Sequence, residues 1–168
     1  MPLYGVARYR DALGLIDKLV DLDMFLQLQA EHEQWLELAP LLEHAAVKLL
    51  IDHCGRPSTE GGLDHPAFQR VLDLGRTGRA AIKFSGYSKF CARQFPYEDV
   101  HPFVAALLEA FTPERSMWAS DWPFLRAPER LDIGPLLKLA ETLFPEPEAR
   151  RKIFWTTPMR LFGFSDPA

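Results

Sequence analysis

Residues 47–57 read VKLLIDHCGRP, a nearly continuous apolar run that ends in ionisable and turn-forming residues. Such a run is typical of a buried strand in a parallel sheet. Three other short runs have the same character, and the four begin at residues 24, 47, 80 and 116, so their starts lie 23, 33 and 36 residues apart. This spacing is close to the ~30 residues of a βα repeat. The four predicted strands are Met24 to Ala30, Val47 to Asp52, Ala80 to Ser85 and Ser116 to Ser120.

Helical patterns fill the gaps between these strands. The clearest runs from Val100 to Phe111, where apolar residues recur at the spacing of one helix face. The resulting order is α-β-α-β-α-β-α-β-α-α, which predicts parallel strands with helices packed outside them. The other predicted helices are marked by the apolar residues from Tyr9 to Val20, by Ile133 to Leu143 and by Glu146 to Trp155.

Two gaps carry special helix signals. Pro40 interrupts residues 32–44 and predicts two short pieces or a kink, because proline removes a helical hydrogen bond. Asp64 is expected to cap a helix that has Pro66 in its first turn and stops near Gly75.

The composition fits one globular domain, residues 1–168. Of these residues 48% are hydrophobic, which excludes a disordered chain. The net charge of −4 argues against a nucleic-acid-binding protein, because such proteins are usually basic. Two cysteines are too few for a disulfide framework, and there is no signal-peptide pattern or bilayer-spanning apolar run. We therefore expect a cytoplasmic protein without nucleic-acid or membrane partners.

Functional residues of parallel βα folds gather at the carboxyl ends of strands. His53 and Arg56 both follow the strand that ends at Asp52. The imidazole of His53 can ligate a metal or bond a substrate, and the alternative is a core histidine held by hydrogen bonds. Gly55 and Pro57 predict a tight turn that directs the Arg56 guanidinium, a fork for carboxylates, back over the sheet. The alternative for Arg56 is a solvated surface side chain.

Asp121 ends the last predicted strand and is followed by Trp122 and Pro123, which exclude water and fix the backbone. A carboxylate in this position can bind a metal or take a proton from water. The competing interpretation is a cap, in which Asp121 accepts hydrogen bonds from the amides of the next turn.

Cations gather in the same loops although the chain is net acidic. They are Arg56, Lys89, Arg93 and Arg126. This local bias predicts an anionic substrate, most simply a carboxylate, whereas the alternative is a chance scatter of surface charge. Tyr87 and Tyr97 are further candidates to face the pocket.

Other residue types suggest no catalytic role. Cys54 and Cys91 have no evident histidine partner, and we expect both to be neutral packing residues. The sequence contains no glycine-rich phosphate loop and no serine-centred nucleophile elbow.

Three motifs follow one another in the chain: Leu50-Ile51-Asp52-His53-Cys54-Gly55-Arg56-Pro57, then Lys83-Phe84-Ser85-Gly86, then Met117-Trp118-Ala119-Ser120-Asp121-Trp122-Pro123. Together they resemble the amidohydrolase-2 family and, within it, the branch similar to 2-pyrone-4,6-dicarboxylate lactonase. The closing residues 158–164, PMRLFGF, are similar to the family's carboxyl-terminal signature. The resemblance covers nearly the whole chain.

The resemblance implies a hydrolase with a (β/α)₈ barrel, acting on a lactone or ester of a small carboxylated substrate. The aspartate that matches Asp121 activates the attacking water. The histidine that matches His53 binds metal in metal-dependent members and substrate in the lactonase branch, and the arginine that matches Arg56 contacts a substrate carboxylate. With these we group Tyr87, Lys89 and Arg126 as substrate-binding candidates. The cofactor is left open: one divalent metal, zinc or manganese, held by His53 and Asp121, or none.

The chain also departs from the family pattern. The family opens with an H-x-H pair, which this sequence lacks. Phe124 stands where the family often has histidine, and Thr157 stands where it usually has asparagine. A barrel needs eight strands and typically about 250 residues, whereas four strands are predicted here. The sequence therefore predicts the carboxyl-terminal half of a barrel.

Two hypotheses follow for function. In the first, the chain is half of a lactonase-type hydrolase, inactive or nearly so alone, and self-association or a complementing amino-terminal half completes it. In the second, the chain is a non-catalytic relic that serves as a binding or assembly module, which Phe124, Thr157 and the missing H-x-H pair favour.

Overall fold

The computed structural model describes residues 12–44 and 46–165. Within them, four parallel strands form one sheet in the order β1-β2-β3-β4. Each strand lies inside the run that predicted it, and this sequential parallel order is what repeated βα units produce. The predicted α/β fold is thus confirmed for the described residues. The strands are β1 (Phe25–Leu28), β2 (Lys48–Ile51), β3 (Ala80–Phe84) and β4 (Ser116–Trp118).

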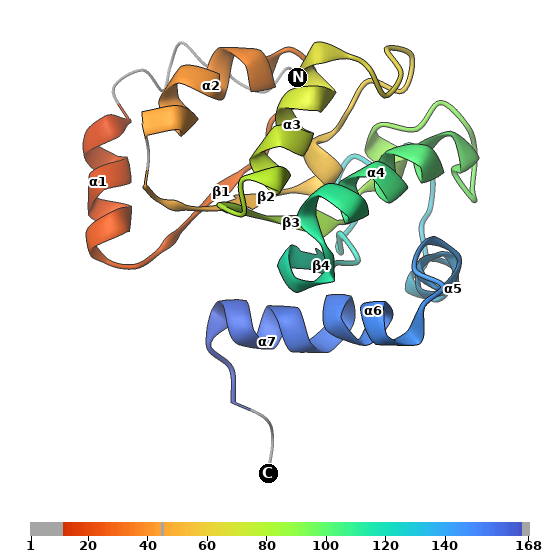
Figure 1. Cartoon of the computed structure of the whole chain (residues 1–168). Helices are drawn as coiled ribbons and strands as arrows, with labels where there is room; N and C mark the ends of the chain where they lie inside the picture. Colours follow the sequence, from red (N-terminus) through yellow and green to blue (C-terminus); the bar gives the residue numbers. More distant parts are fainter. Residues whose placement is uncertain (1–11, 45, 166–168) are drawn as a thin grey trace.

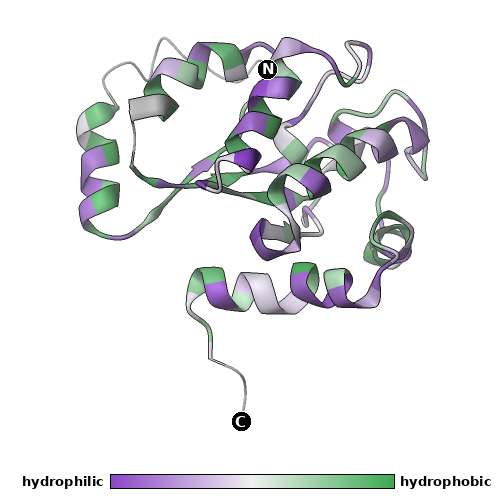
Figure 2. Ribbon diagram, viewed as in Figure 1, coloured by the Kyte–Doolittle hydropathy of each residue, from purple (hydrophilic) through white to green (hydrophobic). Residues whose placement is uncertain are grey.

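Helices cover the sheet in the predicted order. In Figure 1, α2, α3 and α4 lie above the sheet, whereas α6 and α7 lie below it. Figure 2 shows hydrophobic and hydrophilic stretches alternating around these helices, as expected for helices that cover a sheet. The helices are α1 (Leu13–Asp21), α2 (Gln34–His44), α3 (Pro66–Arg76), α4 (His101–Phe111), α5 (Ile133–Leu143), α6 (Pro147–Arg151) and α7 (Thr157–Phe162).

The main core lies between the sheet and the helices above it. Ile51, Ile82 and Phe84 of the strands form one cluster with Leu107 and Phe111 of α4. All five side chains are 0% exposed. Burial of such residues supplies most of the free energy that holds parallel strands and their covering helices together.

The opposite face of the sheet carries a smaller cluster. Leu50, Ala81 and Met117 are buried there, and Phe25 and Leu161 of α7 pack against them. Neighbours along a strand point to opposite faces, which is why Leu50 and Ile51 belong to different clusters. We call this second face the inner face, because it would line the interior if the sheet closed into a barrel.

Pro40 does not divide its segment into two helices, because α2 is a single helix that contains this residue. Trp35 and Leu38 before the proline and Leu42 after it are all buried in the same core. Packing of both halves against one surface offsets the roughly 3 kcal/mol that an interior proline costs a helix.

The start at Pro66 and the end near Gly75 agree with the predicted α3, but its predicted cap was wrong. His65, and not Asp64, caps the helix, because its Nδ1 accepts a hydrogen bond from the Ala67 amide at 3.3 Å. Gly75 lies within the helix. A Cβ at Gly75 would come within 2.6 Å of the Phe111 ring, so this glycine allows α3 and α4 to pack closely.

The last predicted helix extends further than residues 146–155. After α6 a π-helical turn, Lys152–Thr156, leads directly into α7. Pro158 is the second residue of α7 and directly follows this turn. The extension carries Leu161 onto the inner face.

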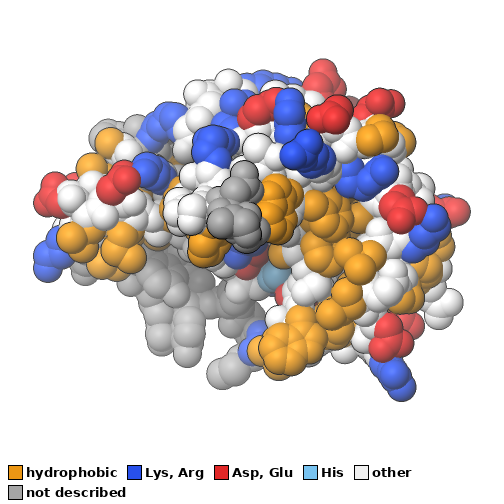
Figure 3. Space-filling view, turned by 90° about the horizontal axis from the view of Figure 1, so that it is seen from below, with side chains coloured by type: hydrophobic (Ala, Val, Ile, Leu, Met, Phe, Trp, Pro, Cys, Tyr) orange, Lys and Arg blue, Asp and Glu red, His pale blue; other side chains and the backbone are white. Residues whose placement is uncertain are grey.

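Both outer strands of the sheet are edges among the described residues: β1 pairs with β2, and β4 pairs with β3. Seen from below, hydrophobic side chains form a broad band on the surface beside a hollow (Figure 3). No described helix is long and apolar enough to cross a membrane.

Candidate functional site

The turn after β2 presents the first group of polar side chains. His53, Cys54, Gly55 and Arg56 all have positive φ, from 43° to 70°. Such backbone is costly for non-glycine residues and is found where surrounding structure enforces it. Here the buried indole of Trp35 donates a 2.7 Å hydrogen bond to the Gly55 carbonyl. The turn therefore holds His53 and Arg56 in defined positions beyond the strand end.

His53 is fixed on both sides of its ring. Nδ1 lies 2.9 Å from the Ser85 hydroxyl, and Nε2 lies 3.5 Å from a carboxylate oxygen of both Asp52 and Asp121. Burial lowers the pKa of His53 below its ordinary value, and the two carboxylates only partly oppose that effect. The imidazole is therefore held neutral between two carboxylates. Gly86 leaves room for it, because a Cβ there would lie 2.6 Å from Nδ1.

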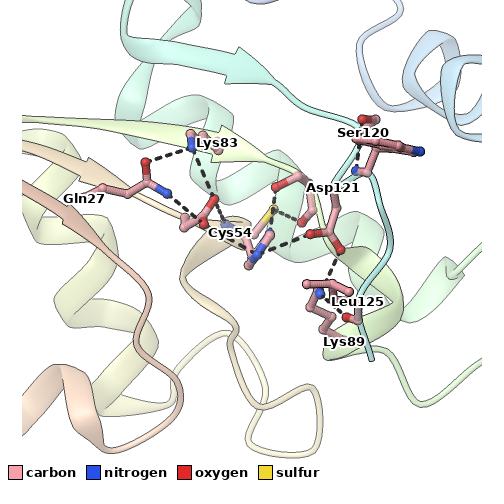
Figure 4. Close-up of polar contacts among 11 residues, drawn as sticks. Gln27, Cys54, Lys83, Lys89, Ser120, Asp121 and Leu125 are labelled. Atoms are coloured by element: carbon pink, nitrogen blue, oxygen red, sulfur yellow. Dashed lines mark hydrogen bonds and ion pairs between the residues drawn. The ribbon is translucent and has the colours of Figure 1, made fainter. Parts of the chain in front are cut away.

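Asp121 follows β4 in a left-handed conformation, with φ of 65°. Its carboxylate lies between His53 and Lys89, whose Nζ is 2.9 Å from Asp121 Oδ2 (Figure 4). Lys89 also donates a hydrogen bond to the Leu125 carbonyl at 2.9 Å. An ionised carboxylate, a neutral imidazole and an ammonium group thus meet at the carboxyl ends of β2, β3 and β4. The peptide bond between Trp122 and Pro123 is cis.

Arg56 and Arg126 reach the same region. Arg56 forms an ion pair with Glu31 at 2.8 Å, and its Nε is a buried atom with no hydrogen-bond partner. Arg126 is exposed. Both arginines line one cavity of about 620 Å³ with His53, Lys89 and Asp121. The remaining wall residues are Gln29, Ser88, Trp122, Pro123, Leu125 and Pro128.

The sequence-predicted candidates therefore divide into two groups. Of the six residues predicted to act on or bind the substrate, five line this cavity and Tyr87 does not. Tyr87 is only 3% exposed and packs edge-on against Phe90 in the core, where burial raises the pKa of its phenol. Tyr97 is 1% exposed, with its ring edge-on against Phe95. Arg93 is exposed outside this cavity, within 3.3 Å of Glu98.

The cysteines are packing residues, as expected. Cys54 is fully buried, and burial raises the pKa of its thiol to about 12. Burial also raises the pKa of Cys91, which is partly exposed. Neither thiol has the lowered pKa that activates a nucleophile.

Sequence reasoning missed a polar network on the inner face. Gln27 donates a 3.0 Å hydrogen bond to Asp52, and Lys83 donates one of 3.0 Å to Gln27 while lying 3.8 Å from Asp52 (Figure 4). The sequence did contain a signal for this network. Gln27 and Lys83 are each the one polar residue of an otherwise apolar strand, β1 and β3, and both share a face of the sheet with Asp52.

The described residues alone do not make up a divalent-metal site. No group of three or more histidine, cysteine, aspartate or glutamate side chains among them could hold a metal ion. His53 and Asp121 offer two ligands, whereas protein zinc sites use three or four. The Lys89 ammonium beside Asp121 also repels a second cation there.

A family model described as amidohydrolase matches residues 3–164. The chain belongs to the amidohydrolase family. It is 34% identical over 146 residues to a 4-sulfomuconolactone hydrolase of Rhizobium radiobacter, covering 85% of this chain and 48% of that protein. It is 28% identical over 124 residues to a 2-pyrone-4,6-dicarboxylate hydrolase of Comamonas testosteroni, covering 68% of this chain and 40% of that protein.

A solved structure shows the same fold. The chain superposes with a TM-score of 0.83 and 22% identity on a probable 2-pyrone-4,6-dicarboxylic acid hydrolase of Acinetobacter baumannii with citric acid bound. The match covers 98% of this chain and 61% of that one. The chain therefore has the α/β fold of its TIM-barrel relatives, and it spans about half the length of the curated relatives it matches.

Proposed function

We propose that the 620 Å³ cavity binds a small carboxylated lactone or ester, which is hydrolysed with Asp121 as the general base. The observation that carries this proposal is the convergence of Asp121, His53 and Lys89, which come from three separate loops. A base and cations facing one cavity suit attack of water on the carbonyl of an anionic substrate.

Each residue has a chemical role in this proposal. Asp121 takes a proton from water, and the water oxygen bonds to the carbonyl carbon. The ester C–O bond then breaks, and the proton passes to the departing oxygen, so that a carboxylic acid and an alcohol result. Nε2 of His53 donates a hydrogen bond to the carbonyl oxygen as negative charge develops there.

The cations bind the substrate's carboxylate groups. Arg56 has a free Nε donor, and Arg126 is an exposed cation on the cavity wall. Charge-assisted hydrogen bonds of this kind are roughly twice as strong as neutral ones. Lys89 forms an ion pair with Asp121 and, from the same cavity wall, can contact a carboxylate of the substrate. Tyr87 lies apart from this cavity, and so we assign it no contact with substrate.

We further propose that additional βα units complete the barrel. Within the part of the chain that the structure describes, β1 and β4 each have one edge without a partner strand, and this supports the proposal because open edges bind further strands. Large apolar side chains of the described chain are also exposed, among them Met24, Trp155, Phe162 and Phe164. The units would come from a second copy or from a complementing amino-terminal half. Light scattering after size-exclusion chromatography should give a molar mass larger than that of one chain. A monomer with full hydrolytic activity would refute the proposal that further βα units are needed.

The activity test compares the wild type with Asp121→Asn on 2-pyrone-4,6-dicarboxylate and 4-sulfomuconolactone, with and without zinc or manganese. We expect the substitution to lower the rate by about 10²–10⁴-fold, the usual contribution of a general base. Asp73→Asn is the matched control, because Asp73 is an exposed aspartate on α3 that pairs with Arg76. An equal loss in both variants would contradict the assigned role.

The second candidate function is a non-catalytic binding or assembly module. Thr157 favours it, because its side chain donates a 2.8 Å hydrogen bond to the Pro113 carbonyl and so has a structural role. The partly buried Phe124, which packs against the core, also favours it. Equal background rates for the wild type and Asp121→Asn would support this second candidate.

A further inference from the structure

Three polar side chains from neighbouring strands form a closed network on the inner face. Gln27 extends from β1 and Lys83 from β3, and Asp52 directly follows β2 between them. The Gln27 amide nitrogen donates to Asp52 Oδ2, and its oxygen accepts from the Lys83 ammonium, both at 3.0 Å. These two bonds fix the orientation of the amide, because only one orientation satisfies both partners.

This network satisfies a buried carboxylate. Asp52 is 8% exposed and lies near the apolar residues Leu50 and Ala81 of the same face. Burial of a charge is costly unless it is paired and hydrogen-bonded. Besides Gln27, the carboxylate has Lys83 at 3.8 Å and accepts a 3.2 Å hydrogen bond from the backbone amide of His53. Asp52 therefore has one well-defined position.

Asp52 in turn contacts the ring of His53. Oδ2 of Asp52 lies 3.5 Å from Nε2 of His53, and Oδ1 of Asp121 lies 3.5 Å from the same nitrogen. Both of these groups are acceptors, whereas Ser85, at Nδ1, carries a hydroxyl that can donate. The network thus assigns one tautomer of the neutral imidazole, with the proton on Nε2 and with Nδ1 accepting from Ser85.

We infer that Gln27 and Lys83 are positioning residues, which fix Asp52 and through it hold His53 as the tautomer that carries its proton on Nε2. The inference deepens the proposed function and rests on it, because that proton is the one offered to the substrate carbonyl. Lys83 and Gln27 do not line the cavity. They therefore act on the reaction only through Asp52 and His53.

The test is a nitrogen-15 spectrum of the histidine rings in the full chain, recorded where the imidazole is neutral. Long-range proton–nitrogen correlations distinguish the protonated ring nitrogen from the unprotonated one, and the His53 signals are those lost in His53→Gln. We expect the Nε2–H tautomer in the wild type. Asp52→Asn should move the population toward Nδ1–H, because an amide NH₂ facing Nε2 donates to it.

Lys83→Met should produce a partial shift in the same direction, whereas Lys83→Arg should restore the wild-type signals. Gln27→Met is a second variant in case the lysine variants fold poorly, because Gln27 is exposed and its loss is milder. Lys138→Met is the matched control, since Lys138 is an exposed lysine of α5 that pairs with Glu141. This control should leave the His53 signals unchanged.

The outcomes separate this inference from the proposed function. Wild-type His53 signals in both Lys83→Met and Gln27→Met would overturn the inference even if the lactone is hydrolysed. If the variants show the predicted tautomer shifts but the wild type hydrolyses no lactone, the proposed function is wrong and this inference about the tautomer stands. Where hydrolysis is measurable, Lys83→Met should lower kcat with little change in KM, because Lys83 does not contact the bound substrate.

Discussion

Substitution of Gly86 by alanine tests the packing around His53 most sharply. Gly86 follows Ser85 at the end of β3 and has a φ of +63°, in the left-handed region. A Cβ at this position would lie 2.6 Å from Nδ1 and 2.9 Å from Cγ of His53. Ordinary contacts of this kind begin at 3.4 Å, so the imidazole would have to move.

Two separate costs add up in Gly86→Ala. The left-handed backbone conformation destabilises an alanine by about 1–2 kcal/mol. About 0.4–1 kcal/mol of this is offset, because alanine also lowers the conformational entropy of the unfolded chain. Displacement of His53 also disrupts its buried 2.9 Å contact with Ser85. Loss of a buried hydrogen bond costs about 1–3 kcal/mol. We therefore expect the free energy of unfolding to fall by roughly 2–4 kcal/mol in total.

Urea unfolding of Gly86→Ala and Gly78→Ala separates these costs. Gly78 has a similar φ of +75°, but a Cβ there would meet nothing within 4 Å. Gly78→Ala therefore carries the backbone cost alone, about 1 kcal/mol. In a His53→Ala background the excess cost of Gly86→Ala should disappear. Equal destabilisation by the two glycine substitutions, within about 0.5 kcal/mol, would refute the proposed contact with His53.

Three further predictions concern other parts of the site. In the native chain only Cys91 should react with Ellman's reagent, because Cys54 is fully buried and its thiol has a pKa of about 12. In urea both thiols should react. Rapid reaction of both thiols in the native chain would contradict this prediction. The free energy of unfolding should fall as the pH drops below about 6.5, because burial sets the pKa of folded His53 below this ordinary value. The unfolded chain then binds more protons than the folded chain, so acid favours unfolding. His53→Asn should make the free energy of unfolding less dependent on pH in this range. An unchanged dependence in that variant would show that His53 does not cause it. Trp35→Phe should lower the free energy of unfolding by about 1–3 kcal/mol through loss of its bond to the Gly55 carbonyl, whereas a neutral effect would show that this bond does not hold the turn.

Much of the fold could be predicted from sequence because it rests on local patterns. The four strands are short apolar runs, and the amphipathic spacing of α4 follows from its own residues. Their order along the chain restricts the topology to parallel βα units. Likewise, His53, Arg56 and Asp121 could be chosen because each follows a strand, and the carboxyl ends of parallel strands meet at one edge of the sheet.

The remaining features depend on contacts between distant residues. Helix α2 continues through Pro40 because residues on both sides of it share one core, and Gly75 serves the packing of α3 against Phe111. Tyr87 follows a strand as the site residues do, but its side chain points into the core. The pairing of Lys83 with Gln27, 56 residues apart, depends on the register of three strands, which the sequence does not show locally.

In the proposed function, the 620 Å³ cavity binds a small carboxylated molecule. The most direct test of this binding is calorimetric titration of 2-pyrone-4,6-dicarboxylate into the wild type, Arg126→Met and Arg93→Met. Both arginines are exposed, but only Arg126 lines the cavity. We predict that Arg126→Met weakens binding by about tenfold or more, since a hydrogen bond to a charged group contributes about 1.5–3 kcal/mol, and that Arg93→Met binds like the wild type. No binding to the wild type, or equal affinity in all three proteins, would contradict the proposed binding.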